Sequence, residues 1–148
     1  MKNTIIVDID GTISKVGNRL KFLLESPKDW DSFYNACFED QPIREIIDFL
    51  ALLEDHYIIV FCTGRRESVR EITTKWIYKH LGISTYKNNL LMRPNNDYRH
   101  DTIVKPEQLE KAGIELKNIA FVLEDRNSMV KKWRDLGLTC LQVADGDF

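Results

Sequence analysis

The sequence contains few cysteines, and their spacing suits neither a metal site nor a disulfide framework. There are 3 among its 148 residues, Cys37, Cys62 and Cys140, an odd number at widely separated positions. Structural zinc sites need cysteines in closely spaced pairs, so we do not expect a zinc site. Reduced thiols in a cytoplasmic protein fit this pattern best.

The sequence also lacks a long apolar run and an excess of charge of either sign. No stretch approaches the roughly 18 apolar residues that suggest a transmembrane helix, and Met1–Asn3 leads straight into a strand-like pattern. We therefore expect neither a membrane span nor a signal peptide. The formal net charge of −2 argues against broad electrostatic adhesion to nucleic acid, but it leaves room for a local basic site.

Two nucleotide-binding signatures are missing as well. No Gly-x-Gly-x-x-Gly follows a predicted strand, which disfavours a dinucleotide site. No Gly-x-x-x-x-Gly-Lys-Ser/Thr occurs, so we expect no P-loop kinase function in this chain. The composition, with 43% hydrophobic and 30% charged residues, is that of an ordinary globular protein. The length predicts one domain over residues 1–148.

Near the amino terminus, a short apolar run ends in two carboxylates. Thr4–Val7 is followed by Asp8-Ile9-Asp10-Gly11-Thr12. Such runs are typical of buried strands in a parallel sheet, where ligands bind at the carboxyl ends of the strands. Residues i and i+2 of a strand point the same way, so Asp8 and Asp10 could share a hard cation such as Mg²⁺. The alternative is an acidic strand end that caps a neighbouring helix.

The rest of the chain alternates between strand and helix patterns. Further strands are predicted at 57–62, 90–92, 119–123 and 138–143, and helices at 42–53, 67–80, 105–111 and 128–136. This alternation implies an α/β fold, with helices on both faces of a central five-stranded parallel sheet. Residues 14–41 break the pattern, and we expect a small insertion over the strand ends. A helix over Pro27–Phe38 would place its aromatic side chains on one side.

Polar clusters follow three of the predicted strands. They are Asp8-x-Asp10, Thr63-Gly64-Arg65 and Glu124-Asp125-Arg126. A parallel sheet brings the carboxyl ends of its strands to one edge, so these clusters should meet there. Lys105, which opens a predicted helix, can reach the same edge.

In chain order, these residues resemble the four motifs of the haloacid dehalogenase (HAD) superfamily of phosphotransferases. The motifs are Asp8-x-Asp10-Gly11-Thr12, Thr63, Lys105 and Glu124-Asp125, and they span the whole chain. The resemblance implies a three-layer Rossmann-like fold, with a small cap insertion at about 14–41 after the first strand. It also implies a Mg²⁺-dependent phosphatase.

A more specific resemblance is to the 3′-phosphatase domain of phage polynucleotide kinase-phosphatase. It is carried by Lys15, Arg19, Thr63-Gly64-Arg65, Arg99, Asp101, Val104-Lys105, Asp125-Arg126, Trp133-Arg134 and residues 142–148. The sequence departs from that domain at three points. The kinase half is absent, position 124 is Glu where that domain has Asp, and residues 20–41 differ in content.

The resemblance implies roles for the catalytic residues. Asp8 would attack the phosphorus and form an aspartyl-phosphate, while Asp10 would protonate the leaving oxygen and later deprotonate the attacking water. Thr63 and Lys105 would bind the transferring phosphoryl oxygens. Mg²⁺ would be held by Asp8, the backbone carbonyl of Asp10 and Asp125, with Glu124 as a direct or water-mediated ligand.

Further residues are expected to bind the substrate. They are Thr12, Arg19, Gly64, Arg65, Arg99 and Asp101. Arginine can hold phosphate with two parallel hydrogen bonds, and Asp101 could orient one of the arginines. For each arginine the alternative is a surface position or a structural ion pair. Trp30 or Tyr34 in the insertion could stack on a base, or the aromatic residues could only attach the insertion to the core.

Three functions are compatible with the sequence. The first is removal of a 3′-phosphate from DNA or RNA ends without a kinase domain, with room for a separate kinase or ligase partner. The second is a nucleotidase that acts on nucleoside monophosphates or other small phosphomonoesters. The third is a non-catalytic subunit in nucleic-acid repair, against which the complete set of motifs argues. We expect the first.

Overall fold

The protein is built on one parallel sheet. A computed structural model describes residues 1–148 and places five strands in the order β5-β4-β1-β6-β7, all parallel to their neighbours. These strands are β1 (Thr4–Val7), β4 (Ile58–Arg66), β5 (Leu90–Arg93), β6 (Ile119–Glu124) and β7 (Cys140–Gln142). The predicted α/β class and the five-stranded parallel sheet are confirmed.

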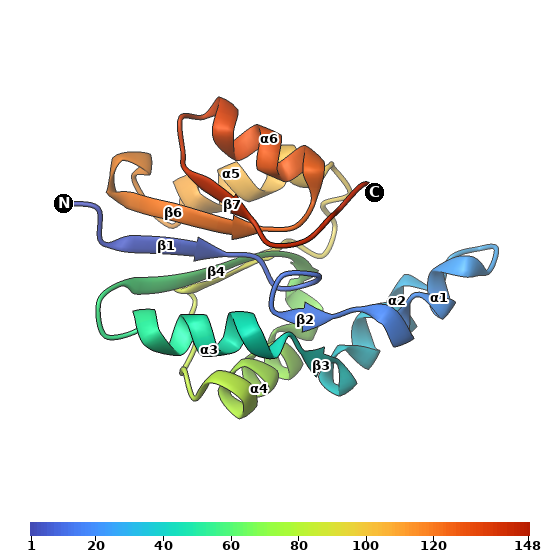
Figure 1. Cartoon of the computed structure of the whole chain (residues 1–148). Helices are drawn as coiled ribbons and strands as arrows, with labels where there is room; N and C mark the ends of the chain where they lie inside the picture. Colours follow the sequence, from blue (N-terminus) through green and yellow to red (C-terminus); the bar gives the residue numbers. More distant parts are fainter.

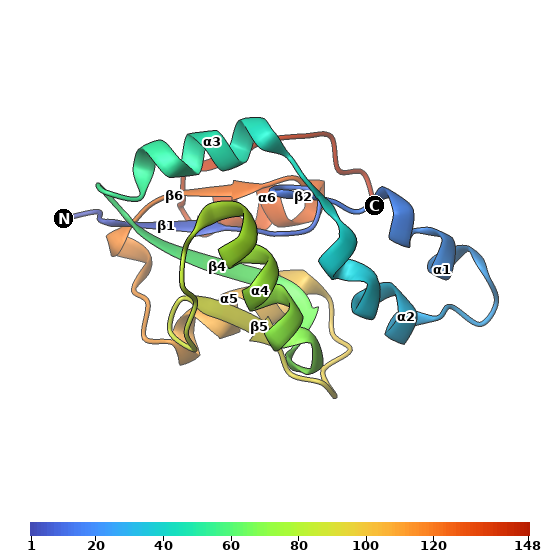
Figure 2. The ribbon, with the colours of Figure 1, turned by 90° about the horizontal axis from the view of Figure 1, so that it is seen from below.

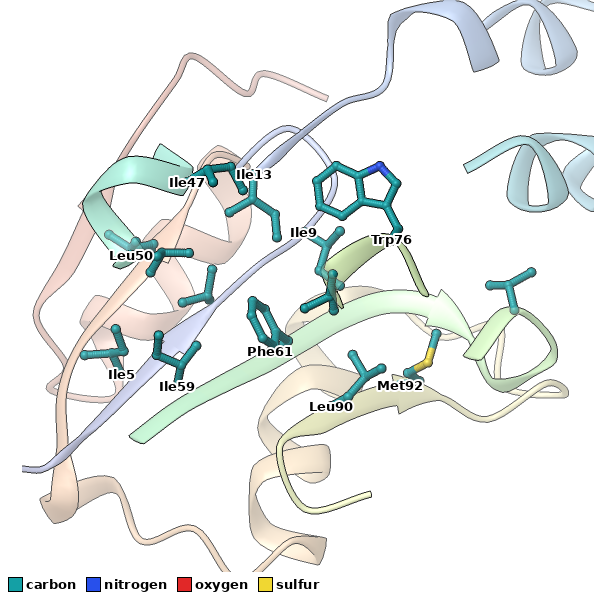
Figure 3. Packing of buried hydrophobic residues seen from close by; sticks show 14 residues of the cluster. Ile5, Ile9, Ile13, Ile47, Leu50, Ile59, Phe61, Trp76, Leu90 and Met92 are labelled. Atoms are coloured by element: carbon teal, nitrogen blue, oxygen red, sulfur yellow. The ribbon is translucent and has the colours of Figure 1, made fainter. Parts of the chain in front are cut away.

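Helices cover both faces of this sheet (Figures 1 and 2). One face packs against α3 (Arg44–Leu53) and α4 (Arg70–Leu81), and the other against α5 (Asp101–Lys111) and α6 (Asn127–Asp135). Two apolar cores result, because successive side chains of a strand point to opposite faces. In β1, Ile5 and Val7 enter the α3/α4 core shown in Figure 3, whereas Ile6 enters the other.

The strand order reverses at β1, which lies between β4 and β6. In open α/β sheets such a reversal leaves a crevice at the carboxyl ends of the strands, and ligands bind there. Asp8 follows β1 directly, and its amide donates a hydrogen bond of 3.0 Å to the carbonyl of Leu123 in β6. The first aspartate of the sequence motif therefore stands at the switch point of the sheet.

Residues 14–42 form the insertion, which projects beyond the ends of these strands (Figure 1). Its elements are β2 (Ser14–Lys15), η1 (Gly17–Arg19), α1 (Lys21–Leu24), α2 (Trp30–Asn35), η2 (Ala36–Glu39) and β3 (Gln41–Pro42). β2 and β3 pair antiparallel and close its base. The helix expected over 27–38 is shorter, because Asp29 accepts a 3.0 Å bond from the amide of Ser32 and caps α2.

Other boundaries also differ from the sequence patterns. α3 begins at Arg44 rather than residue 42, because Pro42 pairs with Ser14 in the small sheet. α5 begins at Asp101, a turn before Lys105, because the His100 side chain accepts a hydrogen bond from the amide of Thr102 and caps it. The remaining elements are two 3₁₀ turns, η3 (Glu67–Val69) and η4 (Leu116–Asn118).

The three cysteines are unpaired and buried. None of the helices combines the length and the apolar character that crossing a membrane requires.

Candidate active site

A cleft of about 960 Å³ opens at the carboxyl ends of the strands. Its floor carries polar side chains from the motifs: Asp8, Asp10, Thr63, Lys105, Glu124 and Asp125. One wall is apolar and comes from the insertion, with Leu20, Leu23, Trp30, Phe33 and Tyr34. The structure thus brings together motif residues that lie up to 117 positions apart in the chain.

Three carboxylates converge on this floor. Asp8, Glu124 and Asp125 are buried, and one ligand atom from each lies within 4.8 Å of the others. Lys105 Nζ donates to Asp8 Oδ1 at 2.7 Å and to Glu124 Oε2 at 2.9 Å. One ammonium against three carboxylates leaves two negative charges unbalanced. Buried charge of that size calls for a compensating cation, and a set of carboxylate oxygens suits a divalent one such as Mg²⁺.

Burial and the excess of negative charge together determine the protonation of this acidic cluster. Burial, together with the charge of Glu124 and despite Lys105, raises the pKa of Asp8 to about 7. Burial and the neighbouring Asp8 raise the pKa of Asp125 to about 6. Burial alone would lower the pKa of Lys105, but Asp8 and Glu124 outweigh it and the pKa is raised. In the metal-free protein, Asp8 and Asp125 therefore retain protons at a pH where ordinary aspartates have lost them.

Gly11 and Thr12 hold this acidic cluster together. Thr12 Oγ1 lies 3.1 Å from Asp8 Oδ2 and 3.3 Å from Asp125 Oδ1, so this hydroxyl positions the carboxylates rather than lying free for substrate. Gly11 has φ +84°, and a Cβ there would stand 2.1 Å from Asp125 Oδ2. The turn after the first motif therefore requires glycine for two reasons, its backbone conformation and the close approach of Asp125.

A second buried cluster surrounds Asp10. Arg19 and Arg65 each place a terminal guanidinium nitrogen (NH2) 2.6 Å from Asp10 Oδ1. Asp40, at the end of the insertion, accepts a 2.7 Å bond from Arg19 and lies 3.4 Å from Arg65. It also accepts a 2.8 Å bond from Ser14. Two arginines and two aspartates balance in charge, so this cluster has no need of a metal ion.

The partners of Asp10 decide its charge state. Burial would raise its pKa, but the nearby Arg65 and Arg19 outweigh burial and lower it to about 2. Strand alternation predicts that the carboxylates of Asp8 and Asp10 share one cation, whereas in this structure the Asp10 carboxylate is paired with Arg19 and Arg65. Its side chain is absent from the acidic group that could hold a metal. In this structure Arg19 and Arg65 donate hydrogen bonds to Asp10 and Asp40, so their guanidinium groups are not free to bind a phosphate.

The remaining predicted residues lie around the floor of the cleft. Thr63 is buried and its hydroxyl accepts a 3.1 Å bond from the amide of Arg65. Gly64 packs so closely on Asp101 that a Cβ would come within 2.8 Å of a carboxylate oxygen. Arg99 lies on the rim, paired with Asp97 at 2.8 Å and Glu107 at 2.6 Å.

Asp101 is surrounded by arginines. Its carboxylate pairs with Arg93 and accepts a 2.9 Å bond from Arg126. The expectation that Asp101 orients an arginine thus agrees with its contacts, which involve two of them. Its carboxylate is occupied by these two guanidinium groups in this structure.

Sequence reasoning missed Asp40 and Arg66. Asp40 lies in an insertion without a recognisable motif, and its role depends on contacts with Arg19 and Arg65 that only the fold creates. A buried aspartate directly before the paired segment Gln41–Pro42 is not distinguishable in sequence from a surface one. Arg66 follows Arg65 in β4, but consecutive strand residues point to opposite sides, so it enters the cleft and not the cluster.

Comparisons with known proteins agree with the geometry. A protein-family model described as the polynucleotide kinase PNKP phosphatase domain matches residues 2–148. The chain is 29% identical over 134 residues to a protein of Autographa californica nuclear polyhedrosis virus, whose name describes a bifunctional polynucleotide kinase/RNA ligase. That match covers 89% of this chain and 18% of the viral protein.

Solved structures give the same result. A chain in the structure of the Pnkp1/Rnl/Hen1 complex is 32% identical, with a TM-score of 0.80, and the match covers 100% of this chain and 48% of that one. The chain therefore spans less than half the length of these relatives. The class C acid phosphatase from Bacillus anthracis is 17% identical, with a TM-score of 0.69 over 97% of this chain and 66% of its own. At that identity the likeness shows the shared fold alone.

Proposed function

Because the chain belongs to the family of polynucleotide kinase PNKP phosphatase domains, we propose that it removes the terminal 3′-phosphate from nucleic-acid ends. It is a HAD-type phosphatase domain by family and fold. The observation that carries the proposal is the junction of two clusters at one cleft, an acidic one around Asp8 and an arginine-bound one around Asp10. The first suits a metal and a nucleophile, and the second suits an acid–base group.

We propose Mg²⁺ as the cofactor, held by Asp8, Asp125, the backbone carbonyl of Asp10, and Glu124 directly or through water. The residues fit the ion, because their oxygens converge and their charge exceeds that of Lys105 by two. When bound, the ion would screen the negative charge that otherwise keeps a phosphate away from a carboxylate nucleophile.

Asp8 is the proposed nucleophile. Its Oδ1 accepts from Lys105 and its Oδ2 from Thr12, so the carboxylate is fixed at the floor of the cleft. Attack on phosphorus would form a bond from Asp8 to the phosphoryl group, expel the 3′-oxygen of the substrate, and leave an aspartyl-phosphate for water to hydrolyse. Lys105 and Thr63, which line the cleft beside Asp8, would bind the transferring oxygens.

Asp10 is the proposed acid and base. Its lowered pKa favours the carboxylate, the form that takes a proton from the attacking water in the second step. In the first step Asp10 must instead carry a proton for the leaving oxygen. That role requires Arg19 or Arg65 to loosen its contact with Asp10 when a phosphate enters, since arginine binds phosphate in the same bidentate manner as carboxylate.

Replacing Gly11 by Ala is expected to weaken Mg²⁺ binding about 10- to 100-fold, because the new Cβ would displace the carboxylate of Asp125. Phosphatase activity at limiting Mg²⁺ should fall in parallel. Gly82→Ala is the matched control: Gly82 has φ +70°, but nothing lies within 4 Å of the added Cβ. Both variants should lose stability through backbone strain, and Mg²⁺ titration of activity should separate them. Equal Mg²⁺ affinity in the two would contradict the proposed role of Asp125.

Stability should depend on Mg²⁺ and pH together. The pKa values of Asp8 and Asp125 are raised above the ordinary 3.8, so the folded metal-free protein binds extra protons and loses stability as the pH rises from about 4 to 7. Mg²⁺ needs the ionised carboxylates and should therefore stabilise more at pH 8 than at pH 5. At Mg²⁺ concentrations about 100 times Kd, we expect Tm to rise by about 5–10 °C at pH 8.

Thermal unfolding with Mg²⁺ or with a chelator, at the two pH values, measures this effect. Ca²⁺ at equal ionic strength controls for general screening by salt, since its larger size and coordination number suit this compact site less well. A Mg²⁺ effect that is larger at pH 5 than at pH 8 would contradict the assignment of the acidic cluster as the metal site.

The function is tested by phosphate release from two kinds of substrate in Mg²⁺, a 3′-phosphorylated oligonucleotide and a panel of nucleoside monophosphates. The proposal predicts that kcat/KM is higher for the oligonucleotide. The converse preference would assign the domain as a nucleotidase. Tight binding of the oligonucleotide without any phosphate release would assign it as a binding subunit.

We infer further that this domain works beside kinase and ligase activities. The viral relative carries a name that combines a polynucleotide kinase with an RNA ligase, and the related chain of the solved complex is described together with Rnl and Hen1. Removal of a 3′-phosphate yields a 3′-hydroxyl, and ligation needs a free 3′-hydroxyl together with a 5′-phosphate. A partner would therefore act on the same nucleic-acid ends, whether on a separate chain or as another part of a longer one.

A further inference from the structure

A row of four planar side chains runs along the mouth of the cleft. It consists of Trp30 and Tyr34 from α2, Arg66 at the end of β4, and Tyr98 after β5. Trp30 and Tyr34 stack with ring centroids 6.0 Å apart and an interplanar angle of 26°. The Arg66 guanidinium carbon lies 5.4 Å from the ring centroid of Tyr34 and 5.4 Å from that of Tyr98. We call these four residues the stacking row.

Arg66 differs from the other arginines of the cleft. Arg93 and Arg126 pair with Asp101, and Arg99 pairs with Asp97 and Glu107. The side chain of Arg66 makes no hydrogen bond. Its one acidic neighbour, Asp31, is 3.7 Å away and its side chain is 90% exposed, so it is a weak partner. The guanidinium therefore lies mainly against ring faces, and its N–H donors have no hydrogen-bond partner.

These properties match the chemistry of a nucleic-acid strand. A phosphodiester offers two oxygens to a guanidinium, and nucleobases stack on exposed aromatic faces. The rings at the two ends of the row are open to solvent, with Trp30 39% and Tyr98 76% exposed. Asp8 on the floor and the row at the mouth belong to one cleft, so a substrate with its terminal phosphate at Asp8 can extend along the row.

We propose that the stacking row binds the strand that precedes the terminal 3′-phosphate, with Arg66 on the adjacent phosphodiester and Tyr98 or Trp30 against a base. The row would make the enzyme prefer polynucleotide ends to mononucleotides, because a nucleoside 3′-monophosphate has no phosphodiester for Arg66. This inference rests on the proposed 3′-phosphatase function and names what selects its substrate.

The test compares kcat/KM for a 3′-phosphorylated oligonucleotide with kcat/KM for the nucleoside 3′-monophosphate of its last residue. Arg66→Gln should lower the ratio of the two values about 10- to 100-fold, the effect of losing hydrogen bonds to a charged group. Tyr98→Ala should lower it about 5- to 100-fold, chiefly through KM for the oligonucleotide. Arg44→Gln and Tyr86→Ala, at exposed positions outside the cleft, should leave the ratio unchanged.

Strand binding can be measured without turnover. A labelled 3′-phosphorylated oligonucleotide is titrated with the Asp8→Asn protein and, separately, with the double variant Asp8→Asn/Arg66→Gln, and its fluorescence anisotropy is followed. The affinity of the double variant for the oligonucleotide should be about 10- to 100-fold lower. If the wild-type protein released no 3′-phosphate, the proposed function would be refuted. If oligonucleotide binding still depended on Arg66 in that case, the stacking row would be supported. An unchanged ratio and unchanged binding would overturn the row, even where the 3′-phosphatase activity is present.

Discussion

The Asp8→Asn variant is expected to release phosphate at least about 10⁴-fold more slowly than wild type, because an amide cannot replace the attacking carboxylate. The fold should survive. Asp8 is buried beside Glu124 and its pKa is raised to about 7, so the folded metal-free protein already tolerates an uncharged group at this position. Steady-state phosphate release and thermal unfolding of the same preparation measure both expectations.

Asp48→Asn provides the control, since it makes the same chemical change at an exposed position of α3. It should match wild type in both activity and Tm. Residual turnover above about one hundredth of wild type in Asp8→Asn would mean that water attacks the phosphorus directly, and the nucleophile assignment would then fail.

Replacing Lys105 by Met should damage both stability and catalysis. The change removes the ammonium that lies 2.7 Å from Asp8 and 2.9 Å from Glu124, and it leaves two buried carboxylates facing each other. Breaking a buried ion pair in this way costs about 3–5 kcal/mol. The loss of one donor to the transferring phosphate should lower kcat by about 10²- to 10³-fold. Urea unfolding and phosphate release at saturating Mg²⁺ measure the two effects.

The dependence on conditions distinguishes this electrostatic account from simple loss of packing. The free energy lost should be largest in chelator at pH 8, where Asp8 and Asp125 ionise, and smaller at pH 5, where both retain protons. Lys111→Met, at an exposed position of the same helix, should show neither effect. A loss for Lys105→Met that is independent of pH and Mg²⁺ would indicate a packing role alone.

Much of the fold could be predicted from periodicity because local pattern and burial coincide in this protein. Ile5, Ile6 and Val7 all enter a core, which is why a continuous apolar run marked β1. The boundaries that differed depend on contacts distant in sequence. Pro42 is typical of a helix start, yet it pairs with Ser14. β4 continues past Cys62 because Arg66 pairs with Arg93 of β5.

The site was predictable to the extent that its motifs follow strands. Asp8, Glu124 and Asp125 meet because a parallel sheet brings the carboxyl ends of its strands together, and Lys105 reaches them from α5. The arginine cluster was not predictable from spacing, since Asp40 lies in an insertion whose path no periodic pattern specifies. For the same reason, alternation along β1 suggested that Asp8 and Asp10 share a cation, whereas Arg19 and Arg65 hold Asp10 apart from the acidic cluster.

The central claim is that this cleft removes a terminal 3′-phosphate from a nucleic-acid strand by means of Asp8. The most direct test is phosphate release in Mg²⁺ from one oligonucleotide sequence in two forms, phosphorylated at its 3′ end or at its 5′ end. The account predicts release from the 3′ end with kcat/KM at least about 100-fold higher than from the 5′ end, and none with Asp8→Asn. Equal release from both ends, or release by the Asp8→Asn protein, would contradict it.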